Sequence, residues 1–436
     1  MDKVTYCKIL DLLHREVKPA LGCTEPIAVA LCVARAVDAY RTEVNPAAGD
    51  GDISRVTVHV CAGILKNAMG VGIPGTGQTG LPIAVAMAAV CGNWHYGLEV
   101  LKDLDANSIA RARRLVDGGR VCVRAQDSDK VLYVRAECEF ADGVRSECIV
   151  EDVHDHITYV ACAGRVLLDE RSAGAKALDG GDGRFLSLEL INEFAREADL
   201  ADLDLIREQI RLNTALSEEG LRGDYGLRVG KTIAEGFGDG VFGKTLDSVC
   251  MARTAAGSDA RMAGCTLPAM SNSGSGNQGL TVSLPVIATA EYLGSGEERL
   301  IRALAVSNLV AIHIKSYLGR LSALCGCVVA STGSSCGIVM LKGGGVVEMA
   351  SAIKNMIGSI TGMICDGAKE GCALKVASGV SCALQSAVLA LKGICAQPTD
   401  GIIDADIEKT IQNLGNIGAS GMKTTDSLIL DIMLCK

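Results

Sequence analysis

The sequence predicts an α+β protein, in which a mainly helical domain carries an inserted α/β domain with an antiparallel sheet. Two patterns indicate this fold class. Apolar residues recur at helical spacing in residues 2–18, in residues 25–41 and through most of the chain after residue 185. Short segments with alternating apolar residues follow one another between residues 120 and 164, which is typical of antiparallel strands.

Changes in composition predict where the parts of the chain begin and end. A first strand (RVTVHVCAG), a glycine-rich loop and helices from about Leu81 to residue 118 precede the run of strands. The glycine-rich segment AGAKALDGGDG follows that run and is typical of a linker, and later glycine- and serine-rich turns separate helices. The predicted division is an N-terminal helical part at 1–45, the inserted domain at 46–165, a linker at 166–184 and a large helical part at 185–436.

The bulk composition indicates a well-buried protein with small side chains. The chain has 436 residues, of which 49% are hydrophobic and only 3% aromatic, together with 51 glycines. This length allows two or three domains. Because so few large rings are available, we expect helices to pack closely through small side chains.

Charge and hydropathy exclude two classes of partner. The net charge is −9, and no basic stripe is interleaved with aromatic residues, which argues against nucleic acid. The dense apolar stretch at residues 81–91 is too short to cross a bilayer, and the N-terminus has no signal-peptide core. We therefore expect a cytoplasmic protein without nucleic-acid or membrane partners. The 19 cysteines are then reduced thiols rather than a disulfide framework.

Two cysteines stand in an unusually polar setting. Cys365 and Cys372 lie in GMICDGAKEGCALKVASG, which has four glycines and no aromatic residue. On a continuous helix their positions would be about 10 Å apart. Gly367 and Gly371, however, permit a turn that brings the two thiols together.

Three further cysteines, Cys325, Cys327 and Cys336, lie in SALCGCVVASTGSSCG. The first two would point to different sides of a helix or turn, so at most one of them should be a ligand. No CxxC pair exists, which makes structural zinc unattractive. On spacing alone, core positions are favoured over metal ligation for all of these cysteines.

Cys23 lies directly before a predicted helix that Thr24 can cap and in which Pro26 stands near the start. A thiol in this position has its thiolate favoured by the helix dipole and the free amides. A buried cysteine in a turn is an equally good interpretation by position alone.

Two other motifs are weaker. The loop GVGIPGTGQTG lacks the GK[ST] ending of a P-loop and the GxGxxG spacing, so a tight turn before a helix is favoured over nucleotide binding. Carboxylate binding at its amides stays open. His154 and His156 flank Asp155, and an exposed strand edge is favoured over a metal site.

Several long motifs together resemble the L-cysteine desulfidase family and, more distantly, the iron–sulfur L-serine dehydratases. The matching stretches cover nearly the whole chain. They are ALGCTEPIAVA at 20–30, KNAMGVGIPGTG at 66–77, SNSGSGNQG at 271–279, ICDGAKEGCALKV at 364–376 and NIGASGMKTTDSLIL at 416–430.

The resemblance implies an α,β-elimination that converts L-cysteine to pyruvate, ammonia and sulfide. It implies a [4Fe–4S] cluster in the helical catalytic domain, held by three cysteines with one iron open as a Lewis acid. Carried over by position, the ligands are Cys365, Cys372 and Cys325, with Cys327 or Cys336 as alternatives for the third. Cys23 would be the general base, and the substrate would be held by Asn67, Ser273, Ser275 and Asn277.

Alternatives stay open. An L-serine dehydratase would use the same cluster, with water as leaving group. A non-catalytic metabolite- or metal-binding protein and a pyridoxal enzyme with Lys375 as Schiff-base lysine are weaker interpretations. Some serine dehydratases place a C-terminal cysteine on the open iron; Cys435 is penultimate here, which favours a free tail thiol. The expected partner is a small amino-acid substrate, and the sequence leaves room for a homodimer.

Overall fold

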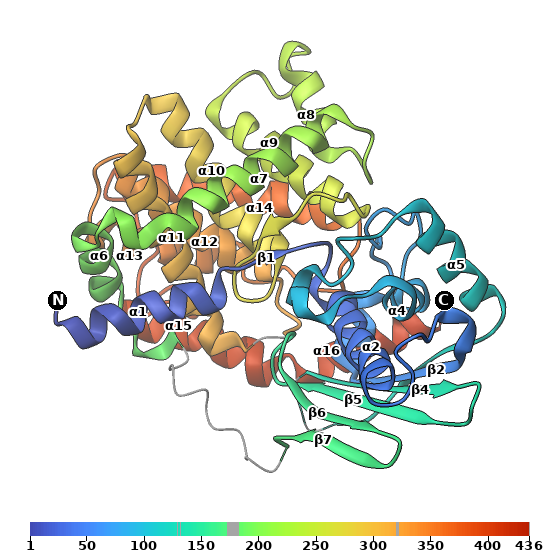
Figure 1. The fold of residues 1–436 in the computed structure, drawn as a ribbon. Helices are drawn as coiled ribbons and strands as arrows, with labels where there is room; N and C mark the ends of the chain where they lie inside the picture. Colours follow the sequence, from blue (N-terminus) through green and yellow to red (C-terminus); the bar gives the residue numbers. More distant parts are fainter. Residues whose placement is uncertain (129, 131, 172–182, 320–321, 436) are drawn as a thin grey trace.

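The computed structural model describes residues 1–128, 130, 132–171, 183–319 and 322–435. They form two lobes, each with its own apolar core (Figure 1). The smaller lobe is a sheet with helices on one face, and the larger lobe is a helical bundle. Helices therefore dominate an α+β fold, and the predicted fold class is confirmed.

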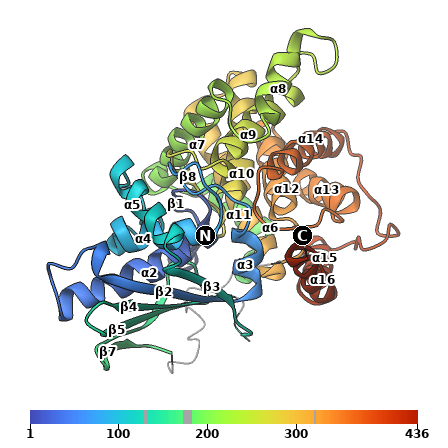
Figure 2. The same ribbon diagram turned by 90° about the vertical axis from the view of Figure 1, so that its right-hand side faces the viewer.

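The smaller lobe is built on a six-stranded sheet with the strand order β3-β2-β4-β5-β6-β7. Its helices α2 and α4 lie over one face of the sheet, as Figure 2 shows. Their apolar faces meet alternating strand residues, which gives the lobe its own core. The strands are β2 (Ile53–Val60), β3 (Val121–Ala125), β4 (Tyr133–Phe140), β5 (Arg145–Glu151), β6 (Ile157–Cys162) and β7 (Arg165–Asp169). The helices are α2 (Thr24–Glu43), α3 (Ala62–Ala68), α4 (Leu81–Cys91) and α5 (Ala106–Asp117).

One strand runs against the prediction. β3 pairs with β2 in parallel, whereas β2 and β4 to β7 pair antiparallel. The reason is that α3, α4 and α5 lie between β2 and β3 in the chain and form the crossover that a parallel pair requires. The sheet is therefore mixed. β7 also extends into the segment predicted as a linker, most of which lies outside the described residues.

The larger lobe surrounds a central helix, α12. Residues 327–341 of this helix are all buried, and α10, α11, α13 and α14 pack around it. The helices of the lobe are α1 (Lys3–Glu16), α6 (Leu188–Glu197), α7 (Asp204–Arg222), α8 (Val229–Glu235), α9 (Leu246–Met262), α10 (Gly276–Leu293), α11 (Glu297–Leu318), α12 (Gly326–Leu341), α13 (Val346–Ile360), α14 (Cys372–Ala390), α15 (Ile407–Asn416) and α16 (Lys423–Leu434).

The two predicted N-terminal helices belong to different lobes. α1 buries Ile9, Leu12 and Leu13 in the bundle core, whereas α2 packs on β4, β5 and β6. Between them, β1 (Pro19–Ala20) pairs with β8 (Ala269–Met270) of the larger lobe. The prediction grouped residues 1–45 with the helical domain, but the packing groups only α1 with it. The start of α2 consequently lies at the junction of the lobes.

One helix within the described ranges, α14, is long and apolar enough by composition to cross a bilayer. Half of its apolar window is buried inside the protein, where α14 packs against α9, α12 and α13. This is the environment of a core helix in a bundle. The expectation of a cytoplasmic protein stays a prediction.

Close packing through small residues gives a first testable outcome. A methyl group on Gly220 of α7 would lie 2.0 Å from the carbonyl oxygen of Ala256 on α9. Gly220→Ala should therefore lower the free energy of unfolding by about 1–3 kcal/mol, because overpacking outweighs the gain in helix propensity. Urea unfolding measures this. The matched control is Gly238→Ala, where an added methyl meets no atom within 4 Å; equal stabilities of the two variants would contradict the packing argument.

Candidate active site at the junction of the lobes

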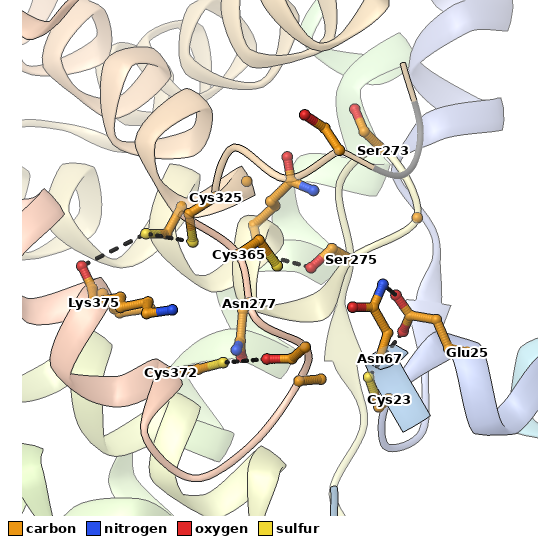
Figure 3. A pocket seen from close by; sticks show the side chains of 18 of the residues that line it. Cys23, Glu25, Asn67, Ser273, Ser275, Asn277, Cys325, Cys365, Cys372 and Lys375 are labelled. Atoms are coloured by element: carbon orange, nitrogen blue, oxygen red, sulfur yellow. Dashed lines mark hydrogen bonds between the residues drawn. The ribbon is translucent and has the colours of Figure 1, made fainter. Parts of the chain in front are cut away.

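A cavity of about 100 Å³ lies where the two lobes meet. The smaller lobe contributes Cys23, Glu25, Asn67 and His154 to its lining. Most of the lining comes from three stretches of the larger lobe: the turn before α10, the turn before α12, and the segment that leads into α14 (Figure 3). All eight residues predicted from the sequence as site residues line this cavity: Cys23, Asn67, Ser273, Ser275, Asn277, Cys325, Cys365 and Cys372.

Four helices point their N-termini at the cavity. Cys23 is the N-cap of α2, Ser275 of α10 and Cys325 of α12, and Cys372 is the first residue of α14. A helix N-terminus carries a partial positive charge and unsatisfied amide groups. Each of the four ends therefore offers amide groups and a partial positive charge to an anion in the cavity.

The thiols of Cys325, Cys365 and Cys372 gather on the side of the cavity formed by the larger lobe (Figure 3). Cys325 interacts with Cys365, and Cys365 interacts electrostatically with Cys372. The Cys325 Sγ atom also lies 3.3 Å from that of Cys327. The neighbouring Cys327 raises the pKa of Cys325, Cys325 raises the pKa of Cys365, and burial raises the pKa of Cys372.

The turn predicted between Cys365 and Cys372 is present. Gly367 has a φ of +91°, and a side chain there would lie 2.3 Å from the carbonyl oxygen of Lys66 in the smaller lobe. Lys66 in turn donates to the carbonyl oxygen of Cys365 at 3.4 Å and forms an ion pair with Asp426 of α16. The buried Lys66 side chain thus fastens the smaller lobe to the segment that carries the thiols.

The alternative third ligands differ in position. Cys327 lines the cavity, but its thiol contacts the Met363 sulfur at 3.4 Å and the Lys375 carbonyl oxygen at 3.6 Å. Cys336 is completely buried in the bundle core and does not line the cavity. Cys435 is exposed at the end of α16 and also lies outside the lining.

Cys23 forms a hydrogen-bonded pair with Glu25, which sequence reasoning missed. The Cys23 thiol donates to Oε2 of Glu25 at 3.0 Å. The other carboxylate oxygen accepts from Asn67 Nδ2 at 3.1 Å, so Asn67 holds the carboxylate in place. Glu25 belongs to the quoted motif ALGCTEPIAVA, and its spacing of two residues from Cys23 was the available signal.

Of the two interpretations of Cys23 that its position left open, the structure agrees with the buried cysteine. Its pKa is raised well above the ordinary value by burial first and by the negative charge of Glu25 second, although Arg261 acts in the opposite direction. The helix N-terminus is in place, but the desolvation of a completely buried thiol outweighs it. Cys23 is therefore a buried thiol whose hydrogen-bond acceptor is Glu25.

The turn before α10 forms another part of the cavity wall, with Ser273, Gly274 and Ser275. Ser273 has a φ of +49°, and the Thr24 hydroxyl donates to the carbonyl oxygen of Gly274 at 2.6 Å, which ties this turn to α2. The Ser275 side chain caps α10. Within the described residues, the side-chain oxygens of Asn277 and Gln278 and two nitrogens of Arg261 are buried without a hydrogen-bond partner. Sequence reasoning missed Arg261 and Gln278.

His154 corrects a second expectation. It was predicted on an exposed strand edge, but it lies in the loop between β5 and β6, is buried and lines the cavity. The loop reaches the larger lobe because Asp155 forms a 2.9 Å ion pair with Lys18. The inserted domain therefore forms part of the site.

Two other sequence candidates have structural roles. The loop GVGIPGTGQTG lies outside the cavity lining and hydrogen-bonds to the end of α9, from Gly72 N to Met262 O at 2.9 Å. Lys375 forms an ion pair with Asp366 and donates to the Ile364 carbonyl oxygen at 2.9 Å. Burial lowers the pKa of Lys375, but the opposite effect of Asp366 and the nearby cysteines is larger. The net result is a raised pKa. A Schiff base requires a neutral amine, so this setting is unsuited to a pyridoxal lysine.

Three thiols lining one cavity are the donor type that an iron–sulfur cluster takes. Within the described ranges, no three His, Cys, Asp or Glu side chains converge closely enough to hold one ion. A four-iron cluster binds each cysteine at a different iron, so its ligands need to surround a space rather than meet at a point. Three thiols around a cavity with four helix N-termini fit that requirement.

Comparisons with known proteins find a matching family and similar proteins that cover most or all of the chain. A model of the serine dehydratase alpha chain family matches residues 95–431. A UPF0597 protein of Bacteroides fragilis is 46% identical over 430 residues, which is 98% of both chains. A UPF0597 protein of Parabacteroides distasonis is 46% identical over the full length of both, and one of Clostridium perfringens is 40% identical over 98% of both. The chain belongs to the serine dehydratase alpha chain family.

Proposed function

We propose that this protein is an iron–sulfur-dependent lyase that converts L-cysteine to pyruvate, ammonia and sulfide. One observation carries the proposal: three thiols and a Cys23–Glu25 pair face the same small cavity from opposite lobes. The family description supports a lyase, and the names of the UPF0597 relatives leave the substrate unspecified. The remaining steps follow from the chemistry of the residues around the cavity.

Cys325, Cys365 and Cys372 are the proposed ligands of a [4Fe–4S] cluster. Such a group, when bound, would supply a Lewis-acidic iron for the β-leaving group. The N-termini of α12 and α14 stabilise the charge of the thiolates. Cys325 is preferred to Cys327 because it stands at the N-cap of α12 and interacts with Cys365.

Cys23 and Glu25 act together as the base. The thiol proton passes to Glu25 over the 3.0 Å hydrogen bond, and the resulting thiolate removes the α-proton of the substrate. The electron pair of the C–H bond forms the double bond while the β-sulfur leaves with its own pair. The aminoacrylate released in this way tautomerises, and water hydrolyses it to pyruvate and ammonia.

The same site can eliminate water from L-serine, and the family description favours this second candidate. Both reactions use the same base and the same ligands, so the leaving group alone distinguishes them. Parallel measurement of kcat/KM for L-cysteine and L-serine decides between them. A cytoplasmic location and a homodimer remain predictions from the sequence.

The ligand assignment is tested by Cys365→Ala. The variant, purified without oxygen, should lose most of its iron and labile sulfide, because a ligand of the cluster is missing. Iron analysis and the visible absorption spectrum measure this. The matched control is Cys382→Ala, which removes a half-buried thiol from α14 outside the cavity lining and should keep its iron. Full iron content in Cys365→Ala would refute the assignment.

Cys23→Ser separates a base from a ligand. A serine hydroxyl keeps the shape of the side chain but has a far higher pKa, so turnover should fall roughly 100- to 10,000-fold. The iron content should stay at the wild-type level because Cys23 is not a proposed ligand. Loss of the cluster spectrum in this variant would make Cys23 a ligand instead.

The proton acceptor is tested by the pH dependence of Glu25→Gln. Without the carboxylate, turnover depends on spontaneous ionisation of Cys23, whose pKa burial holds well above its ordinary value. Activity at pH 7 should fall roughly 100-fold or more. The residual rate should then rise roughly tenfold per pH unit between pH 7 and 9, since the thiolate fraction rises by that factor below the pKa.

The control for this experiment is Glu43→Gln at the other end of α2, which should leave turnover and its pH profile unchanged. A flat profile in Glu25→Gln together with wild-type turnover would assign the base elsewhere.

A further inference from the structure

The strongest unexplained feature of the cavity is a buried cation. Arg261 lies in the last turn of α9, lines the cavity and is only 3% exposed. Its Nε and Nη2 atoms have no hydrogen-bond partner within the described part of the chain. A buried guanidinium without a counter-charge is costly, so its retention calls for an anion that arrives from outside the fold.

The fold makes room for this side chain at the start of α10. A Cβ atom on Gly276, the first residue of α10, would lie 2.2 Å from Arg261 Nε. Only glycine therefore allows the guanidinium to lie against the N-terminus of α10. The guanidinium is positively charged and the helix end carries a partial positive charge. The two therefore repel each other unless a negative group lies between them.

No acidic side chain of the described residues neutralises Arg261. Asp259, two residues earlier, accepts a 2.9 Å hydrogen bond from the Gly230 amide. Glu25 also lines the cavity, but it is engaged by the Cys23 thiol and by Asn67. Neither carboxylate is hydrogen-bonded to the guanidinium.

Acceptors for a positive group lie on the same turn of α10. The side-chain oxygens of Asn277 and Gln278 line the cavity and are buried without a donor. A ligand that supplies a carboxylate to Arg261 and an ammonium group to these oxygens would satisfy all three side chains. A zwitterionic α-amino acid has both groups on neighbouring atoms.

We propose that Arg261, Asn277 and Gln278 form a subsite that binds the carboxylate and the amino group of a free α-amino acid. The subsite deepens the proposed function, on which its place in a reaction rests. Arg261 is then the residue that selects free amino acids over amides, esters and peptides. A planar guanidinium suits this role because it binds a carboxylate with two parallel hydrogen bonds.

Binding of inert ligands tests the subsite without relying on turnover. L-Alanine has the carboxylate and amino group but no leaving group, and L-alaninamide lacks the carboxylate. Calorimetry on the protein purified without oxygen should show that Arg261→Gln weakens L-alanine binding roughly 10- to 100-fold. L-Alaninamide should bind weakly and equally to the variant and the wild type. Wild-type affinity of Arg261→Gln for L-alanine, or no binding of L-alanine by the wild type, would overturn the proposal.

Two further variants separate binding from a structural role. Arg253→Gln changes an arginine on the same helix that pairs with Glu291, and should leave L-alanine binding unchanged. Arg261→Lys keeps the positive charge but loses the planar guanidinium, so its affinity for L-alanine should be intermediate. If Arg261→Gln does not fold, Arg261→Lys is the variant measured in its place. Without ligand, Arg261→Gln should melt at or above the wild-type Tm, because an unpaired buried charge is removed. A lower Tm together with unchanged L-alanine binding would make Arg261 structural.

The outcomes also distinguish the subsite from the reaction. Carboxylate-dependent binding that is lost in Arg261→Gln supports the subsite even where L-cysteine and L-serine are not consumed. Consumption of L-cysteine with unchanged L-alanine binding in the variant leaves the reaction standing and overturns the subsite.

Discussion

The convergence of four helix N-termini on one cavity is the constraint on which the rest of the structure depends. Each end carries a partial positive charge, and four of them together are unfavourable unless negative groups lie between them. The fold enforces this approach with close contacts at glycines: Gly276 admits the Arg261 side chain, and Gly367 admits the backbone at Lys66. The thiols of Cys325 and Cys372 stand at two of these helix ends, where a negative charge is favoured.

The site also requires both lobes. α2 packs on the sheet of the smaller lobe, yet its N-cap Cys23 faces the thiols of the larger lobe. Contacts between the lobes hold them in this arrangement. Lys66 forms an ion pair with Asp426 and a hydrogen bond with the Cys365 carbonyl oxygen, and the Thr24 hydroxyl donates to the Gly274 carbonyl oxygen. The smaller lobe is consequently part of the candidate active site rather than an appendage, which the predicted boundary at residue 45 had obscured.

The long sequence motifs located the site. Properties that depend on burial or on the direction of strand pairing could not be predicted from them. The motifs brought Cys23, Asn67, Ser275 and the three thiols to one cavity, and Gly367 correctly predicted the turn that allows this. Arg261 gave no signal, because one arginine at the end of a helix resembles any surface arginine until its burial is known. β3 was assigned the wrong direction because alternation of side chains is the same in parallel and antiparallel strands.

The burial of Cys23 decides which chemistry its thiol can offer. Position before a helix predicts a thiolate, but burial decides the pKa of a thiol that no water reaches. The burial that isolates the cavity from water thus deprives Cys23 of its activity as a base, unless a carboxylate accepts its proton. Glu25 is the carboxylate proposed for this role: it accepts the thiol hydrogen bond at 3.0 Å, and Asn67 holds it from the other side. Arg261 opposes the effect of Glu25 on Cys23, so the residue proposed to anchor the substrate also favours the ionised base.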